Sequence, residues 1–378
     1  MKKNRSTRLF FMTLSRLLVG LVFVFSAFVK GVDPLGTAYK IEDYFVAFGT
    51  DWANGMALSL AVFLCAFEFT IGISMLFKIR MKITSGLLLA TMIFFTLLTF
   101  NDALFEPVPD CGCFGDALKL TNWQTFYKNI VLIVFVGYLF IRRKEYDNRI
   151  SVPAQSVVAV SVFIIFSMFS IYNLRHLPMI DFTKWKVGTQ VLSDKAIESQ
   201  TFVSYRNAKT KEVKEFLSPD YPWSDSIWMS EWRFVGQRVV TDEEQVGLDL
   251  FIEDESGNDF TKDVLLAEKM MVITIPDISE VSHDDLLKIV RLQHDLQQID
   301  IRLTILSGSI PDEMDALRDI LNNDSEIYFS DATVLKTMVR SNPGIIVFAN
   351  GRLIKKWHYR DIPEREEVVN ILRVNKIN

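Results

Sequence analysis

The sequence predicts an α-helical multi-pass membrane bundle followed by a soluble α/β domain. Nearly all long uncharged apolar runs of the 378 residues fall within residues 1–175, whereas residues 176–378 alternate apolar and charged positions. The charges divide along the same line. Residues 1–175 hold 17 Lys and Arg against 11 Asp and Glu, and residues 176–378 hold 24 against 35. The chain is therefore membrane-embedded first and water-soluble second.

Five segments are long and apolar enough to cross a bilayer, which needs about 20 mostly apolar residues. Four of them form a predicted bundle over residues 1–150, at about 9–29, 55–77, 83–104 and 124–141. A fifth membrane helix occupies 151–175. The first run follows a basic start but is over-long for a signal peptide and lacks a small-residue cleavage site, so we expect it to stay attached.

Positive charges predict the orientation of these helices. Lys and Arg gather at the N-terminus, at 78–82 and at 142–149, which all fall on one side of the membrane. The positive-inside rule places that side in the cytoplasm. We therefore expect a bacterial inner-membrane protein in contact with lipid, with residues 105–123 and the soluble domain in the periplasm. The excess of acidic over basic residues in the soluble part argues against a nucleic-acid partner.

Two of the three cysteines lie one residue apart, in the stretch "DCGCFGD" at 110–116. On the outer side, Cys111 and Cys113 meet an oxidising compartment. A disulfide across one residue closes a small, strained ring, and strained disulfides are the labile ones. Three interpretations stay open: a redox-active dithiol, a local structural disulfide or inert pair, and a soft-metal site. The four histidines are scattered through the soluble part, so no metal cluster is predicted.

Charged residues near this loop bear on its chemistry. Asp110 and Asp116 flank the cysteines and disfavour thiolates, so an activating cation such as Lys30 or Lys119 is required. Lys30 and Asp102 fall at the outer ends of spans, where charged groups are ordinary and can line the loop. Cys65, deeper in the second span, is expected to be a small core residue.

Two further charges lie inside the predicted spans. Arg16 falls in the first span and Glu68 in the second, about 10 and 15 Å from the cytoplasmic edge at a rise of 1.5 Å per residue. Charges in the membrane usually pair with one another. We expect an Arg16–Glu68 ion pair; a proton relay or a contact with a quinone head is the alternative.

The runs "RLLVGLVFVFSAFVKGVDPLG" and "CAFEFTIGISMLF", together with the cysteine loop, resemble the DoxX/MauE group of membrane proteins over about residues 8–142. The resemblance implies a four-helix bundle with an outward cysteine loop, associated with periplasmic thiol or electron-transfer chemistry. Carried over by position, its loop cysteines are Cys111 and Cys113, and its polar bundle residues are Arg16, Lys30 and Glu68. Membrane thiol oxidases that use quinone usually have a second cysteine pair, and this sequence has none.

The apolar pattern of residues 265–378 predicts alternating strands and helices. The strands are "MMVITI", "DIRLTIL" and "EIYFS", separated by helices at 282–297 and after 314, and a helix at 332–341 follows. Asn350-Gly351 predicts a hairpin, and the last helix spans about 363–373. This order resembles the thioredoxin fold, with Pro343 at the position of its cis-proline. The stretch "PDISEVSHDDL" stands where a redox-active member has Cys-x-x-Cys.

Residues 176–264 are expected to be an N-terminal extension of the thioredoxin-like domain. They include a strand, turn and strand in "TFVSYRNAKTKEVKEF" and three clustered tryptophans, Trp223, Trp228 and Trp232, which more often pack on a core than form a ligand box.

Two functions remain open from the sequence. The first is a membrane protein of periplasmic thiol redox or protein maturation that exchanges disulfides through Cys111 and Cys113, as an oxidoreductase or an accessory factor. Its partners would be periplasmic client proteins or redox partners. The second is a non-enzymatic scaffold or partner-binding protein with a structural or metal-binding cysteine pair. No cofactor is required, and quinone is a candidate.

Overall fold

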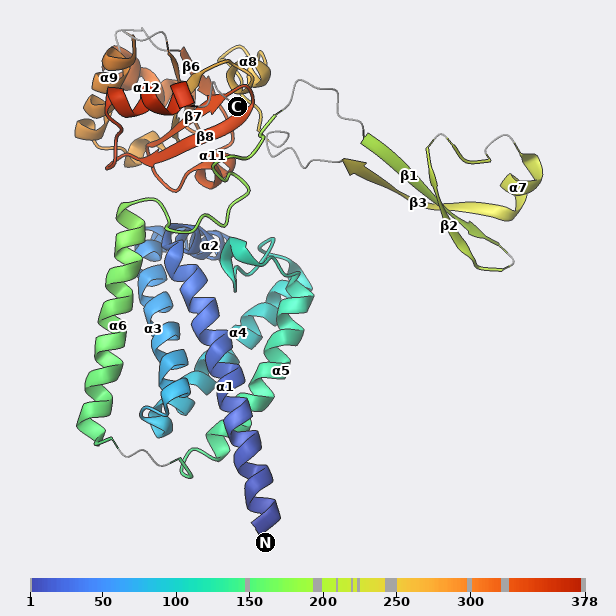
Figure 1. Cartoon of the computed structure of the whole chain (residues 1–378), viewed down its shortest axis with the longest axis vertical. Helices are drawn as coiled ribbons and strands as arrows, with labels where there is room; N and C mark the ends of the chain where they lie inside the picture. Colours follow the sequence, from blue (N-terminus) through green and yellow to red (C-terminus); the bar gives the residue numbers. More distant parts are fainter. Residues whose placement is uncertain are drawn as a thin grey trace.

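Five helices of the described chain are long and apolar enough to cross a membrane, as the sequence predicts (Figure 1). They are α1 (Lys2–Val32), α3 (Ala57–Phe77), α4 (Met81–Phe105), α5 (Asn122–Ile141) and α6 (Val152–Arg175). The structure is a computed structural model that describes residues 2–146, 150–192, 199–208, 210–218, 220–222, 225–241, 250–297, 301–320 and 326–374. The five helices fit a multi-pass membrane bundle.

Helices α1 and α3 approach each other closely at two glycines. A Cβ atom added to Gly72 would lie 2.8 Å from the backbone nitrogen of Val24, and one added to Gly20 would meet the side chain of Leu76. Small residues allow this close approach, which drives helix association in lipid. The bundle core includes Val19, Phe23, Ile71, Met75, Leu132 and Val136.

The connection between α1 and α3 contains helices that the sequence did not predict. Helix α2 (Pro34–Ala47) begins after Asp33, whose Oδ1 accepts a hydrogen bond from the backbone nitrogen of Gly36 at 2.9 Å, and Pro34 occupies the first helical position. A 3₁₀ helix, η1 (Asp51–Met56), leads into α3. Ala38 of α2 packs against Ala57 and Ala61 of α3, so α2 covers the end of the bundle at which α3 begins.

The C-terminal part is built on a five-stranded mixed sheet in the order β6-β5-β4-β7-β8. Strands β4 (Met270–Ile275), β5 (Arg302–Ser307) and β6 (Glu326–Phe329) run parallel, while β7 (Gly344–Ala349) and β8 (Arg352–His358) form an antiparallel hairpin beside β4. Asn350 and Gly351 at the hairpin turn both have positive φ, of 50° and 77°, as the predicted Asn-Gly turn requires. The Asn342–Pro343 peptide bond, directly before β7, is cis.

Side chains on both faces of this sheet are buried. Met271, Ile273 and Ile275 face a core that includes residues of α9 (His283–Gln297) and α12 (Arg365–Val374). The alternate residues Met270 and Val272 face a second core with residues of α11 (Ala332–Met338) and α8 (Thr261–Leu265). The 3₁₀ turn η5 (Pro311–Met314) and helix α10 (Asp315–Ile320) connect β5 to β6. The predicted strands and helices after residue 269 are confirmed, with shifts at their ends.

The region predicted as an extension contributes to two structural units. Trp185, Val191, Leu250 and Ile252 pack into the core of the five-stranded sheet. By contrast, β1 (Ser199–Asn207), β2 (Val213–Leu217) and β3 (Trp232–Thr241) form a separate antiparallel sheet in the order β2-β1-β3, which projects sideways in Figure 1.

This small sheet has an aromatic core. Trp228 of α7 (Ser226–Glu231) stacks on Trp232 with ring centroids 5.5 Å apart. This agrees with the prediction that these tryptophans pack on a core. Trp223 lies outside the described residues. The strand, turn and strand predicted around residue 208 are β1 and β2.

Candidate functional site

Cys111 and Cys113 face each other in the loop between α4 and α5. Their sulfur atoms are 2.7 Å apart, both thiols are free, and both side chains are half-buried. Oδ1 of Asp110 accepts a hydrogen bond from the backbone nitrogen of Gly112 at 2.9 Å, which closes the turn. The hydroxyl of Ser26 on α1 donates to the carbonyl oxygen of Cys113 at 2.7 Å. The loop is therefore fixed to the bundle beside α1.

The turn between the cysteines depends on Gly112, which has a φ of 63°. An added Cβ atom would lie 3.1 Å from Cγ of Lys40, and left-handed backbone costs a side chain about 1–2 kcal/mol. We expect Gly112→Ala to slow closure of the Cys111–Cys113 disulfide by diamide several-fold. Gly112→Asn, which tolerates this conformation better, should be slowed less. Equal rates for all three chains would contradict a role of the turn geometry.

A cavity of about 670 Å³ opens beside the cysteine pair. Its walls come from α1 to α5 and the cysteine loop, and its outer rim includes Lys336 and Arg340 of the soluble domain. Apolar side chains such as Phe23, Met92 and Phe95 form much of the wall. Both cysteines line this cavity.

The predicted Arg16–Glu68 ion pair is wrong. Glu68 pairs with Lys30, whose ammonium donates to Oε2 of Glu68, and both side chains are buried. Arg16 donates instead to the carbonyl oxygens of Met75, at 2.8 Å, and Leu76. The Gly20–Gly72 contact places Arg16 beside the last turn of α3, where carbonyl groups have no partner within the helix. The long side chain of Lys30, in the last turn of α1, reaches Glu68 of α3.

Asp102 is fully buried, contrary to the expectation of an ordinary charged group at a span end. Its Oδ2 accepts a hydrogen bond from the hydroxyl of Tyr44 at 2.7 Å. Tyr44 lines the cavity, so the hydrogen bond from Tyr44 to Asp102 fixes a side chain of the cavity wall.

The loop carboxylates are neutralised by ion pairs. Asp110 lies 3.3 Å from the ammonium of Lys40, and Asp116 accepts from Arg340 at 2.8 Å. Lys119, one of the two cations predicted to activate the thiols, is paired with Asp116 at 3.5 Å. The expected repulsion between these acids and a thiolate is therefore reduced.

The pair of thiols is electrically asymmetric. The hydrogen bond between the two thiols, in which either sulfur can donate, lowers the pKa of Cys113 against the opposing effect of burial, and Lys128 and Lys30 lower it further. The same hydrogen bond, together with burial, raises the pKa of Cys111. Lys128 of α5, whose ammonium lies 4.5 Å from the ring centroid of Phe114, was missed from the sequence. The sequence feature that could have identified Lys128 is a lysine near the start of an otherwise apolar span.

Among the described residues, the structure brings no three His, Cys, Asp or Glu side chains together in a way that could hold a metal ion. The two thiols alone are an incomplete site.

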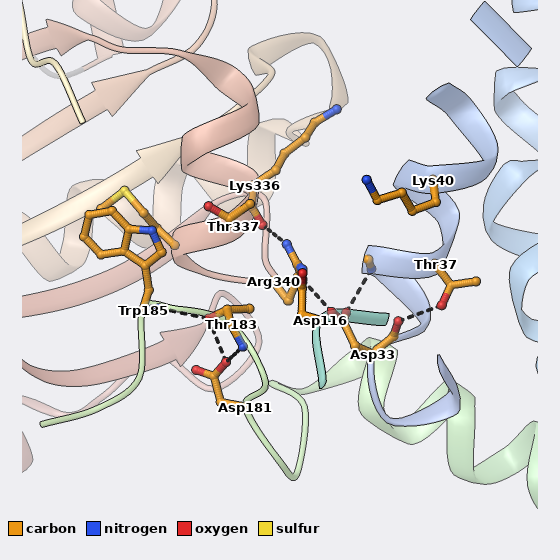
Figure 2. Close-up of polar contacts among 12 residues, drawn as sticks. Asp33, Thr37, Lys40, Asp116, Asp181, Thr183, Trp185, Lys336, Thr337 and Arg340 are labelled. Carbon is orange, nitrogen blue, oxygen red and sulfur yellow. Dashed lines mark hydrogen bonds and ion pairs between the residues drawn. The ribbon is translucent and has the colours of Figure 1, made fainter. Parts of the chain in front are cut away.

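Arg340 joins the soluble domain to the membrane bundle (Figure 2). Its Nε donates to Asp33 and its Nη2 to Asp116, each at 2.8 Å, and its side chain is 7% exposed. Burial opposes the positive charge, but Asp33 and Asp116 raise the pKa of Arg340. Lys336, one turn earlier, lies 3.9 Å from Glu42 and over the ring of Tyr39. The sequence offers no local signal for contacts that span more than 200 residues.

This junction brings the cis-proline turn close to the cysteine loop. Pro343 follows Arg340 by three residues, and Asp116 follows Cys113 by three. The side chain of Asn342 donates to the backbone oxygen of Asp277, after β4. The turn is therefore fixed both to its own sheet and, through Arg340, to the outer end of the bundle.

Comparisons with known proteins agree with the predicted resemblance of the bundle. A family model described as Methylamine utilisation protein MauE matches residues 8–142, the stretch that resembled this group in the sequence. Protein TlpB of Flavobacterium psychrophilum is 24% identical over 212 residues, which cover 53% of this chain and 54% of that protein. The chain thus spans about half the length of the curated relative it matches. No solved structure matches it.

Proposed function

We propose that this membrane protein exchanges thiols and disulfides through Cys111 and Cys113, in periplasmic redox or in the maturation of exported proteins. The observation that carries the proposal is the contact between the two sulfur atoms at the wall of a cavity. The resemblance of residues 8–142 to the DoxX/MauE group, which implies thiol or electron-transfer chemistry, supports it.

The exchange proceeds in two balanced steps. The thiolate of one loop cysteine attacks a client disulfide, so that a bond to one client sulfur forms as the client S–S bond breaks. The other loop cysteine loses its proton and attacks this mixed disulfide. The client leaves as a dithiol with two electrons and two protons gained, and Cys111 and Cys113 are oxidised to a disulfide. Read in reverse, the same steps oxidise a client.

The soluble domain is proposed to be thioredoxin-like and to present clients. Its sheet order, its parallel β4–β5 pair and the cis peptide before β7 support this assignment. It has no Cys-x-x-Cys after β4, where the sequence reads "PDISEVSHDDL", and no other cysteine, so it has no thiol of its own to react. The surface around the turn at Pro343 is proposed to hold an extended peptide near the cavity.

The proposed orientation places the N-terminus in the cytoplasm and the soluble domain in the periplasm of a bacterial inner membrane. The positive charges at the inner connections support it. The ion pairs of Arg340 with Asp33 and Asp116 agree, because they require the soluble domain and the cysteine loop to lie on one side.

Thiol trapping in intact cells tests this function. Cells are quenched with acid at different levels of external oxidant and reductant, and the chain is labelled with a maleimide that shifts its electrophoretic mobility. We expect Cys111 and Cys113 to shift between the reduced and oxidised forms. The single serine variant that keeps the attacking cysteine should accumulate a mixed disulfide with a partner, and the double variant should not.

Cys65→Ser provides the matched control, because Cys65 is fully buried and should leave the redox response unchanged. A pair that stays in one redox state under all conditions, with a double serine variant that remains functional, would favour the scaffold instead. Copper or zinc bound at one equivalent and lost in the double variant would favour a metal site.

A further inference from the structure

The inner part of the cavity contains a buried ion pair that the exchange steps above do not use. The side chains of Lys30 and Glu68 are 8% and 2% exposed, and both line the cavity that Cys111 and Cys113 reach. Oε1 of Glu68 has no hydrogen-bond partner among the described residues. A charged pair in a membrane span is expensive and usually marks a functional site.

Helix geometry places Lys30 on the same face of α1 as Ser26, which holds Cys113. The hydroxyl of Ser26 donates to the carbonyl oxygen of Cys113, and Lys30 lies four residues later on the same helix. Residues four apart share one face of a helix. The ammonium of Lys30 is therefore held on the face of α1 to which the loop is fixed, and its direction is set by Glu68.

The other charges around Cys113 are mostly engaged elsewhere. Lys40 of α2 pairs with Asp110, and Arg340, which follows α11, pairs with Asp33 and Asp116. Glu68 of α3 pairs with Lys30, and the carboxylate of Asp102 on α4 accepts from Tyr44. Lys128 of α5 lies over the ring of Phe114. Lys128, and Lys30 with its partner Glu68, are thus the cations near Cys113 that the loop carboxylates do not neutralise in the described structure.

We propose that Lys30, held in place by Glu68, is a positioning residue that stabilises the thiolate of Cys113 and so makes Cys113 the attacking sulfur. Cys111 is then the resolving sulfur. The inference rests on the proposed exchange function. A positive charge favours a thiolate strongly where water is scarce, because the local dielectric constant is low. Glu68 weakens this effect by its own charge while it fixes the ammonium in one direction.

In this assignment the thiolate of Cys113 bonds to a client sulfur as the client disulfide breaks, and the leaving sulfur takes up a proton. Cys111 then gives up its proton and attacks the sulfur of Cys113. The Cys111–Cys113 disulfide forms, the second client thiol is released, and two electrons have moved to the client.

The test measures the thiol of Cys113 without any client. Cys65→Ser and Cys111→Ser leave Cys113 as the single thiol of the purified full chain, and its alkylation rate with iodoacetamide is followed from pH 5 to 9. In this background we expect Lys30→Met to raise the pH midpoint of Cys113 alkylation and to lower the alkylation rate at pH 7 at least threefold. Lys30→Arg should retain most of the rate, and Glu68→Gln should lower the midpoint.

Arg16→Met is the matched control, because Arg16 is a buried cation of the same helix that contacts carbonyl groups of α3 and not the loop. A merely structural role of Lys30 would make both variants behave alike, which would overturn the proposal. Should Lys30→Met fail to fold, an unchanged midpoint in Glu68→Gln overturns it equally.

The two proposals fail separately. If Lys30→Met leaves the alkylation midpoint of Cys113 unchanged while the wild-type cysteines still change redox state in cells, only the role of Lys30 is excluded. If Lys30→Met shifts this midpoint but the wild-type cysteines never change redox state in cells, only the exchange function is excluded.

Discussion

A chain with Arg340→Leu is expected to react with a bulky maleimide at Cys111 and Cys113 at least tenfold faster than the wild type. The substitution leaves the carboxylates of Asp33 and Asp116 without the cation that joins them to the soluble domain. Removing one partner of a buried, hydrogen-bonded charge pair costs roughly 2–5 kcal/mol. A factor of ten in a population needs only about 1.4 kcal/mol. The soluble domain should therefore leave the cavity rim more often.

The measurement compares a small reagent with a large one on the reduced full chain. Because residues of the soluble domain form part of the rim, the rate with the large maleimide should rise far more than the rate with iodoacetamide. Arg318→Leu is the control, since Arg318 is an ion-paired arginine of the same domain that does not line the cavity. Equal effects of both substitutions would show that the docking contact does not limit access.

Glu68→Leu is expected to lower the free energy of unfolding by about 3–5 kcal/mol, because it leaves the ammonium of Lys30 buried without its counter-ion. The double variant Lys30→Met with Glu68→Leu should recover most of this loss, since replacing a whole buried pair with apolar side chains is often neutral or stabilising. Unfolding in mixed micelles titrated with sodium dodecyl sulfate measures both.

Glu145→Leu is the exposed counterpart. Glu145 pairs with Arg8 and Arg142 at the opposite end of the bundle, and its side chain is 30% exposed, so the change should cost no more than about 1 kcal/mol. A double variant as unstable as Glu68→Leu would mean that Glu68 acts through packing and not through its charge.

Local patterns predicted most of the elements. Long apolar runs predicted the five spanning helices, and alternating strands and helices after residue 269 predicted the order found in the five-stranded sheet. Asn350-Gly351 predicted its hairpin because the turn needs two residues with positive φ. Helix α2 was missed, since a 14-residue segment with charged positions is too short for a span and resembles an outer loop.

Contacts between distant residues could not be predicted in the same way. Depth along two spans suggested Arg16 as the partner of Glu68, but depth says nothing about which face of each helix meets the other. The close approach of α1 and α3 at Gly20 and Gly72 fixes that register. It places Arg16 at the carbonyl groups that end α3 and leaves Glu68 to Lys30.

The sequence by itself determined that the chain enters a membrane, that a soluble α/β domain follows, and that its paired cysteines lie in the connection between two spans. These features depend on hydrophobicity and on neighbouring residues. Only the tertiary structure decided that the loop is fixed to α1 by Ser26, that Lys30 and Lys128 lie near Cys113, and that Arg340 closes the rim. Each of these depends on packing between segments far apart in the chain, for which no local pattern carries information.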